Sequence, residues 1–193
     1  MSSKETVCLQ RRGFLLTGAA TVGACALPQA VWAGNRKKSI ISTEADRTLG
    51  FYNTHTGEEI SATFWADGHY IKDGLREINR VLRDHRNDEI HLIDPRLLSS
   101  LHALQHRLGS RAAIHVISAY RSPATNRLLR SKSRGVAKKS LHMQGKAVDI
   151  RLPDVSLSTL RRAALSLRSG GVGYYSRSNF VHMDVGSVRS WGR

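Results

Sequence analysis

The stretch Ser140-Leu-His-Met-Gln-Gly-Lys-Ala-Val-Asp149, which continues as Ile150-Arg-Leu152, carries the strongest structural signal in the sequence. It contains a histidine, a glycine three residues later and an aspartate seven residues after the histidine. The aspartate lies within an alternating apolar run that is typical of a strand. A histidine on a turn and an aspartate on the next strand can bind one metal ion together. Two ligands are not a complete site, so a third must come from elsewhere.

A second strand-like run, Phe180-Val-His-Met-Asp-Val185, also carries a histidine. Because side chains alternate along a strand, His182 and Asp184 share one face. If this strand pairs beside the strand of Asp149, His182 can meet the other two ligands. Two imidazoles and a carboxylate, with a fourth position left to water, are the ligands of a catalytic zinc site. The expected site is one Zn²⁺ per chain, bound by His142, Asp149 and His182.

The first 33 of the 193 residues have the three parts of a secretory signal: a basic start, an apolar middle and a small-residue exit at Val31-Trp-Ala33. Gln10-Arg-Arg-Gly-Phe-Leu15 resembles a twin-arginine signal. We therefore expect a signal peptide over residues 1–33 and a single domain over residues 34–193, with no membrane span after processing. A retained membrane anchor and a lipid anchor on Cys25 are the alternatives.

Charge and cysteine content restrict the partners of the mature domain. The chain has 30 Lys and Arg against 15 Asp and Glu, and the charge of +15 becomes +13 without residues 1–33. Such an excess favours polyanionic surroundings. Because export separates the protein from nucleic acid, no nucleic-acid partner is expected. Both cysteines, Cys8 and Cys25, lie in the expected signal. The mature domain therefore has no disulfide and no thiolate metal site.

The remaining pattern predicts short strands and about three helices in a single domain. A hairpin is expected from runs 47–52 and 59–65, with His55 exposed at its tip. His102 and His106 are expected to be partly buried structural residues. Helices are expected at 73–85, 95–108 and 155–167, a central strand at 112–120, a solvated turn at 84–89 and a mobile basic loop at 128–139.

The motif Ser140-x-His-x-x-Gly-x-Ala-x-Asp149, together with the later His182, resembles that of the D,D-carboxypeptidase and VanX-type murein metallopeptidases, which have a hedgehog-like fold. Further segments resemble the murein endopeptidase K branch: Tyr52-Asn-Thr-His-Thr-Gly-Glu58, Tyr120-Arg-Ser-Pro123, Gly170-Gly-Val-Gly-Tyr-Tyr175 and Phe180-Val-His-Met-Asp184. The resemblance implies an α+β fold in which a small antiparallel sheet carries the zinc site and packs against about three helices. It also implies a zinc peptidase domain at 34–193, a periplasmic location and cleavage of peptide cross-links in peptidoglycan. The expected partners are peptidoglycan stems, and the expected state is a monomer.

One departure concerns the catalytic residues. Relatives of the dipeptidase type have a general-base Glu three residues before the last histidine, and Asn179 occupies that position here. Asp184 is the replacement candidate, either as the base or as a residue that orients His182. The resemblance also assigns Arg121 to support of a substrate carbonyl or carboxylate, with a salt bridge at the sheet rim as its alternative.

The alternatives to a murein endopeptidase are a murein carboxypeptidase and a weakly active or inactive peptidoglycan-binding module of the same fold. A basic adaptor that acts through its charge is a further alternative, but it has no need of the three ligands. The bond that is cut stays open among D,D links, L,D links and stem-terminal residues.

Overall fold

Strands form the frame of the part of the chain that the computed structural model describes, residues 45–133 and 135–192. One sheet contains eight strands in the order β3-β2-β1-β4-β5-β7-β6-β8. Their bounds are β1 Arg47–Asn53, β2 Glu59–Ala66, β3 His69–Tyr70, β4 Ile114–Ser118, β5 Ala147–Arg151, β6 Gly171–Tyr175, β7 Phe180–Asp184 and β8 Arg189–Trp191. The expected signal peptide, Cys25 included, lies outside the described residues.

The sheet is larger than predicted and is mixed. The pairs β1–β4 and β6–β8 are parallel, and the other neighbours are antiparallel. The prediction of a small antiparallel sheet with about three helices was therefore wrong in size, direction and helix number, although the α and β mixture is confirmed. The sequence signal missed β3 and β8, because two and three residues are too few to show an alternating pattern. It also missed β6, which begins Gly-Val-Gly, because glycine is depleted in strands.

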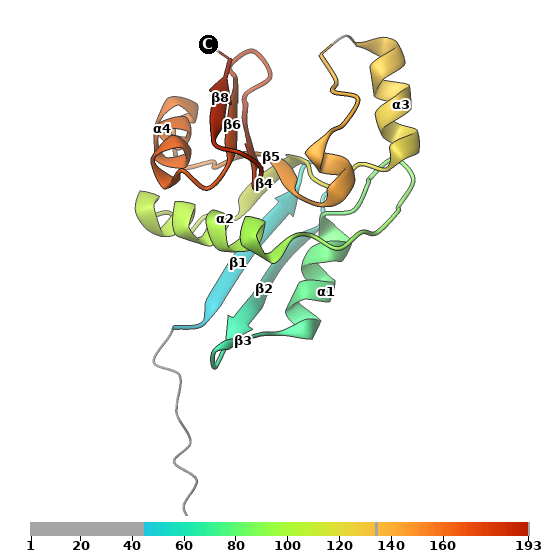
Figure 1. The fold of residues 1–193 in the computed structure, drawn as a ribbon. Helices are drawn as coiled ribbons and strands as arrows, with labels where there is room; N and C mark the ends of the chain where they lie inside the picture. Colours follow the sequence, from blue (N-terminus) through green and yellow to red (C-terminus); the bar gives the residue numbers. More distant parts are fainter. Residues whose placement is uncertain (1–44, 134, 193) are drawn as a thin grey trace, which may run out of the picture. The chain divides into compact units, whose positions relative to one another are not determined.

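Three of the helices cover one face of this sheet (Figure 1). The described residues form α1 Lys72–Val81, α2 Pro95–Leu108, α3 Pro123–Lys132, α4 Leu157–Leu167 and the short 3₁₀ helix η1 Leu141–Gln144. The sequence explains the bounds of α2: Asp94 caps it by accepting a hydrogen bond from the Arg96 amide, and Gly109 ends it in the left-handed conformation. Helices α1, α2 and α4 pack against the sheet and enclose the core. No helix in this part of the chain is long and apolar enough to cross a bilayer.

Helix α3 corrects the prediction of a mobile loop over residues 128–139. The helix continues to Lys132, and residues 133 and 135–139 form neither helix nor strand. Ser122 caps it by accepting a hydrogen bond from Thr125, and Pro123 occupies its first turn. The Leu and Arg residues that follow are good helix formers, so the helix extends although the stretch is basic and contains serine.

Residues 86–89 of the predicted solvated turn are exposed, as expected, but the first residue of the turn is not solvated. Asp84 is buried and accepts a hydrogen bond from the Ser122 amide at 2.9 Å. Its neighbour Tyr120 donates a backbone hydrogen bond to Leu82. These bonds fix the segment between β4 and α3, which contains Arg121. The buried carboxylate therefore has a structural role that the charged composition of this turn did not reveal.

Alternation along two central strands separates the core from the opposite face of the sheet. On β5, Val148 and Ile150 belong to the core, and on β7, Val181 and Met183 do so. Asp149 and the other residues between them consequently face the other side of the sheet. That side is where η1 and the segment after α3 lie (Figure 1).

Candidate metal centre

The three predicted ligands come together. Asp149 on β5 and His182 on β7 are direct cross-strand partners, which places their side chains next to each other on one face. His142 comes from η1, whose start is capped by Ser140 and whose end is the left-handed Gly145. The two strands fix two ligands rigidly, and the short helix brings the third ligand over them.

The spacing of the ligand atoms fits a tetrahedral metal ion. His142 Nε2 lies 3.2 Å from His182 Nδ1 and 3.4 Å from Asp149 Oδ1. His182 Nδ1 lies 2.8 Å from the same carboxylate oxygen. Tetrahedral zinc with bonds of roughly 2.0–2.1 Å separates its ligand atoms by about 3.3 Å. Among the described residues, this is the one group of three or more His, Cys, Asp or Glu that could hold a metal ion.

Hydrogen bonds behind the two imidazoles turn the correct nitrogens inward. His142 Nδ1 lies 2.7 Å from the Ala119 carbonyl oxygen, to which it donates its proton. His182 Nε2 lies 3.2 Å from Asp184 Oδ2 and donates to it. The remaining nitrogens, His142 Nε2 and His182 Nδ1, therefore keep their lone pairs for a cation. Such support of metal-binding histidines is the usual device for fixing both tautomer and ring orientation.

The pKa directions agree with a site built for positive charge. Burial raises the pKa of Asp149, but the adjacent His142 and His182 outweigh burial and hold that pKa well below its usual range. Burial lowers the pKa of His182, while the adjacent carboxylates of Asp149 and Asp184 outweigh it and raise the pKa. The carboxylate is thus ionised in the pH range in which proteins function, and it provides the negative charge that a divalent cation needs.

Asp184 lies behind His182 and is fully engaged. Its Oδ1 accepts hydrogen bonds from the amides of Gly171 and Gly186 at 2.9 and 2.8 Å, and from Arg189 Nη1 at 3.2 Å. Its Oδ2 accepts from Arg189 Nη2 at 2.6 Å and from His182. The side chain is completely buried. Both oxygens therefore point at protein donors.

Arg121 lines the cleft that holds the three ligands, and it does not form the alternative salt bridge with any described residue. Its Nη atoms make long hydrogen bonds, at 3.5 Å to Asn126 and 3.3 Å to Ser118. Its buried Nε has no partner among the described residues. Burial lowers its pKa, an effect that the nearby Asp149 opposes. A guanidinium held in this way can bind an incoming carbonyl or carboxylate.

The cleft has a cavity of about 380 Å³ with the three ligands at its floor. One wall comes from the segment after α3 and includes Val136 and Lys139. The other wall is aromatic and comes from β6, β7 and β8, with Tyr175, Phe180 and Trp191. In Figure 1 the ribbons of β6 and β8 and of the segment after α3 lie on opposite sides of β5. The floor can hold a cation, and the walls can hold an extended peptide.

Asn179 does not line this cleft. It lies in the turn before β7 with a positive φ of 53°, and it lines a separate depression beside Arg151 and Leu157. Position 179 therefore does not point at the metal centre in this protein. Its departure from the dipeptidase pattern leaves the three-ligand site unchanged.

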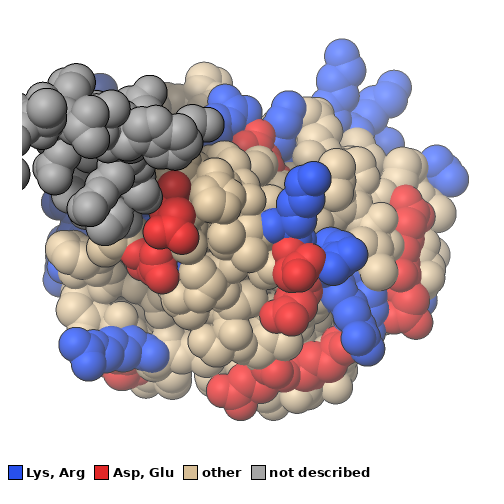
Figure 2. All heavy atoms as spheres, turned by 90° about the horizontal axis from the view of Figure 1, so that it is seen from below, with Lys and Arg blue, Asp and Glu red and all other residues tan. Residues whose placement is uncertain are grey.

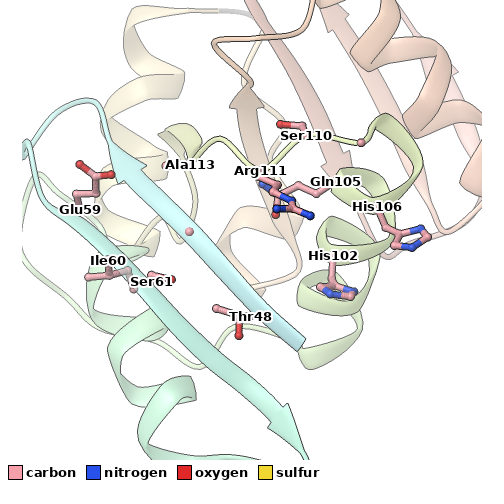
Figure 3. A pocket seen from close by; sticks show the side chains of 12 residues that line it. Thr48, Glu59, Ile60, Ser61, His102, Gln105, His106, Ser110, Arg111 and Ala113 are labelled. Atoms are coloured by element: carbon pink, nitrogen blue, oxygen red, sulfur yellow. The ribbon is translucent and has the colours of Figure 1, made fainter. Parts of the chain in front are cut away.

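The other predicted histidines lie away from the metal centre. His55 is exposed at the hairpin tip, as expected, and its ring contacts the Ile117 carbonyl oxygen at 3.0 Å. His102 is half-buried, but His106 is exposed, which corrects the prediction for that residue. Both line a larger cavity of about 790 Å³ between β1, β2 and the C-terminal end of α2 (Figure 3).

Sequence reasoning missed four supporting groups: the Ala119 carbonyl, Asp84, Arg189 and Trp191. A backbone carbonyl has no sequence signal, and Asp84 lies in a run that is typical of solvated turns. Arg189 and Trp191 lie in the three-residue strand β8. The sequence Gly171-Val-Gly173 on the neighbouring strand could have indicated them, because glycine within a strand marks a close approach.

Comparison with known proteins agrees with this geometry. Residues 41–191 match the model of a family described as Peptidoglycan L,D-endopeptidase MepK, Peptidase_M15_2. The chain is 46% identical over 181 residues to the protein of that name from Escherichia coli K12, covering 94% of this chain and 96% of the relative. It is 41% identical over 182 residues to a probable protein of that name from Haemophilus influenzae, covering 94% and 95%.

Proposed function

Because the chain belongs to the peptidoglycan L,D-endopeptidase MepK family, we propose that it is a zinc-dependent murein endopeptidase that cleaves L,D peptide cross-links. The observation that carries the proposal is the converging set His142, Asp149 and His182 at the floor of a cleft. We further propose that residues 1–33 direct export to the periplasm and that the mature chain acts as a monomer on peptidoglycan stems.

Zinc, when bound, lowers the pKa of a coordinated water towards about 7 and polarises the carbonyl of the bond to be cut. The protein's own contribution is to hold the three ligands in place with a fourth position open. Asp149 supplies the negative charge, and the two imidazoles supply neutral nitrogen ligands. The rigid pairing of β5 with β7 keeps that geometry during turnover.

We assign Asp184 to positioning rather than to proton transfer. Both of its oxygens already accept hydrogen bonds from Arg189 and from protein amides, and its side chain has no exposed surface. Its remaining contact, with His182 Nε2, holds the ring in the orientation that the metal requires. A general base must reach the proton that it removes, and Asp184 lies behind the ligand instead.

Arg121 is assigned to substrate binding. Its backbone amide donates to the His142 carbonyl oxygen at 3.2 Å, so the arginine and the first ligand are fixed to each other. Its guanidinium has hydrogen-bonding capacity left and lines the cleft. An L,D cross-link between two diaminopimelate residues places a carboxylate next to the scissile amide. Arg121 can bind that carboxylate, or the scissile carbonyl, within reach of the metal centre.

The charge excess is concentrated in the half of the chain that carries the metal centre. Residues 45–120 contain nine Lys and Arg and ten Asp and Glu, whereas residues 121–193 contain 15 and three. Figure 2 shows the face that lies below in Figure 1, where basic and acidic residues are interspersed. The local excess favours approach of the acidic polymer to the catalytic half of the molecule.

Neutralising the exposed cations of α3 should weaken action on whole murein. The variant Arg127→Gln/Arg130→Gln/Lys132→Gln removes three exposed charges beside the cleft. At a few tenths of a kcal/mol per charge, we expect a roughly three- to tenfold lower rate on intact sacculi at low salt. The difference should disappear near 1 M salt, where screening acts over about 3 Å. Rates are measured as peptide amines released.

The matched control is Lys72→Gln/Arg76→Gln/Arg80→Gln, which removes three exposed cations from α1. It changes the net charge equally, but on a helix that packs on β2. Equal losses in the two triple variants would show that only the net charge matters. A soluble cross-linked dimer should be hydrolysed by both variants at the parental rate.

Mass spectrometry of digested muropeptides tests the proposed function directly. Dimers with an L,D cross-link should be split into monomers, and D,D-linked dimers should remain. A chelator should abolish the reaction, and added Zn²⁺ should restore it. Release of a stem-terminal residue alone would identify a carboxypeptidase, and tight binding to sacculi without cleavage would identify a binding module.

A further inference from the structure

Strand β8 lies two strands away from the metal ligand His182, yet its side chains reach the metal centre. The register aligns Asp149, His182, Gly173 and Trp191 in one row across β5, β7, β6 and β8. In the next row on the same face, two residues away along β6, Gly171 is paired with Arg189. The Gly171 amide also donates a hydrogen bond to Asp184 of β7. Each row thus has a glycine on β6 between a residue of β8 and a residue of the metal centre.

The two glycines leave the space through which these side chains pass. A Cβ atom on Gly171 would lie 2.5 Å from both Arg189 Nη1 and Asp184 Oδ2. A Cβ atom on Gly173 would lie 2.6 Å from Trp191 Cε2. Real Cβ atoms do not make such contacts, so any larger residue would displace the arginine or the indole. Glycines at positions 171 and 173 are therefore required for the side chains of Arg189 and Trp191 to pass over β6.

The Arg189 side chain passes over Gly171 and reaches Asp184. Its two Nη atoms contact the two carboxylate oxygens at 3.2 and 2.6 Å, a bidentate pair. The carboxylate in turn accepts the hydrogen bond from His182 Nε2. Arg189 also lies over the Trp191 ring, with 5.0 Å between its Cζ and the ring centroid.

The Trp191 side chain passes over Gly173 and covers the ring of His182. The centroids of the two rings lie 5.2 Å apart at an interplanar angle of 51°. The indole is fixed at its other end, because Nε1 donates a hydrogen bond to the Tyr175 hydroxyl at 2.9 Å. The ring forms part of the cleft wall and limits the access of water to this ligand.

We infer that β8 completes the metal centre: Arg189 is a positioning residue that acts through Asp184 on His182, and Trp191 shields that ligand from the cleft. The inference rests on the metal site of the proposed function and adds a chain of contacts from the sheet edge to the metal. It gives the Gly171-Val-Gly173 segment a role in the metal site.

The test is metal affinity of the purified protein, measured by competition with a chelator of known affinity. Arg189→Gln should bind Zn²⁺ roughly 10- to 100-fold more weakly, the usual effect of losing support behind a metal ligand. Its Co²⁺-substituted form should have an altered visible absorption spectrum. Arg189→Lys should recover only part of the affinity, because an ammonium cannot form the bidentate pair. The arginine side chain is 43% exposed, so Arg189→Gln is expected to fold.

Two further variants test whether the side chains of β8 must pass over β6 to support the metal site. Gly171→Ala keeps the arginine but blocks its path, and should weaken zinc binding as Arg189→Gln does. Trp191→Leu should release zinc to excess chelator several-fold faster. Circular dichroism of the metal-free proteins identifies a variant that fails to fold. If either of these variants does so, the zinc affinity of Arg189→Gln decides whether the inference holds.

The control is Arg76→Gln on α1, an exposed arginine in an i,i+3 pair with Asp73. It should leave zinc affinity and the Co²⁺ spectrum unchanged. Parental affinity and spectrum in Arg189→Gln would overturn the inference and leave the proposed function intact. If the parental protein itself bound no zinc and cleaved no cross-link, the proposed function would be lost as well.

Discussion

Replacing His182 with alanine is expected to abolish zinc binding and cross-link hydrolysis together. His182 provides a nitrogen that lies 2.8 Å from Asp149 and 3.2 Å from His142, so its loss leaves two ligands. The substitution also removes the hydrogen bond that the buried Asp184 accepts from His182. A catalytic metal contributes several kcal/mol to transition-state stabilisation, and every 1.36 kcal/mol is tenfold in rate. We expect the rate to fall at least about a thousandfold.

The measurement combines zinc content after dialysis with the rate of dimer cleavage. His106→Ala is the matched control, because that histidine is exposed on α2 and lines the separate cavity. It should keep both zinc and activity. Parental hydrolysis by the His182→Ala protein would exclude the proposed metal centre, whereas retained zinc without hydrolysis would mean that the ion has other ligands.

The substitution Gly145→Ala is expected to destabilise the fold strongly, by about 2–5 kcal/mol. Gly145 has a φ of 63°, a left-handed conformation that costs a residue with a side chain roughly 1–2 kcal/mol. A Cβ atom there would lie 2.1 Å from the Leu92 carbonyl oxygen, a backbone atom that cannot rotate away. Overpacking of this kind adds about 1–3 kcal/mol. Because Gly145 ends η1, the change also displaces His142.

Gly109→Ala separates the two effects. Gly109 has the same φ of 63°, but nothing lies within 4 Å of a Cβ atom placed on it. It should therefore show the conformational cost alone, about 1–2 kcal/mol. Urea unfolding of the zinc-free proteins measures the loss of unfolding free energy in both variants. If Gly145→Ala cost no more than Gly109→Ala, the close approach of Leu92 would not matter for stability.

The metal centre was largely predictable from the sequence because two of its three ligands lie on strands with clear alternation. Asp149 and His182 each stand between core residues, so their shared face followed from the pattern once the strands were assumed to pair. His142 followed from its spacing to Asp149. The hairpin of β1 and β2 was confirmed for the same reason, since its runs alternate and a turn-rich segment joins them.

The missed parts depend on contacts between distant segments. The parallel pairing of β1 with β4 joins residues about sixty positions apart, and no local pattern specifies it. Arg189 and Trp191 gain their role only because β8 lies beside two glycines of β6. The start of α3 at Pro123 was expected, but its continuation to Lys132 was missed, because the basic composition of residues 128–139 suggested a loop.

The position of β8 has a consequence for how the protein retains its metal. This strand has three residues and is paired on one side only, with β6, among the described strands. Short edge segments open locally at a free energy far below that of global unfolding. Each such opening would withdraw Arg189 and Trp191 while the rest of the sheet stays folded. Zinc that binds the closed form more tightly must shift this local equilibrium, so zinc should slow hydrogen exchange at the β8 amides in particular.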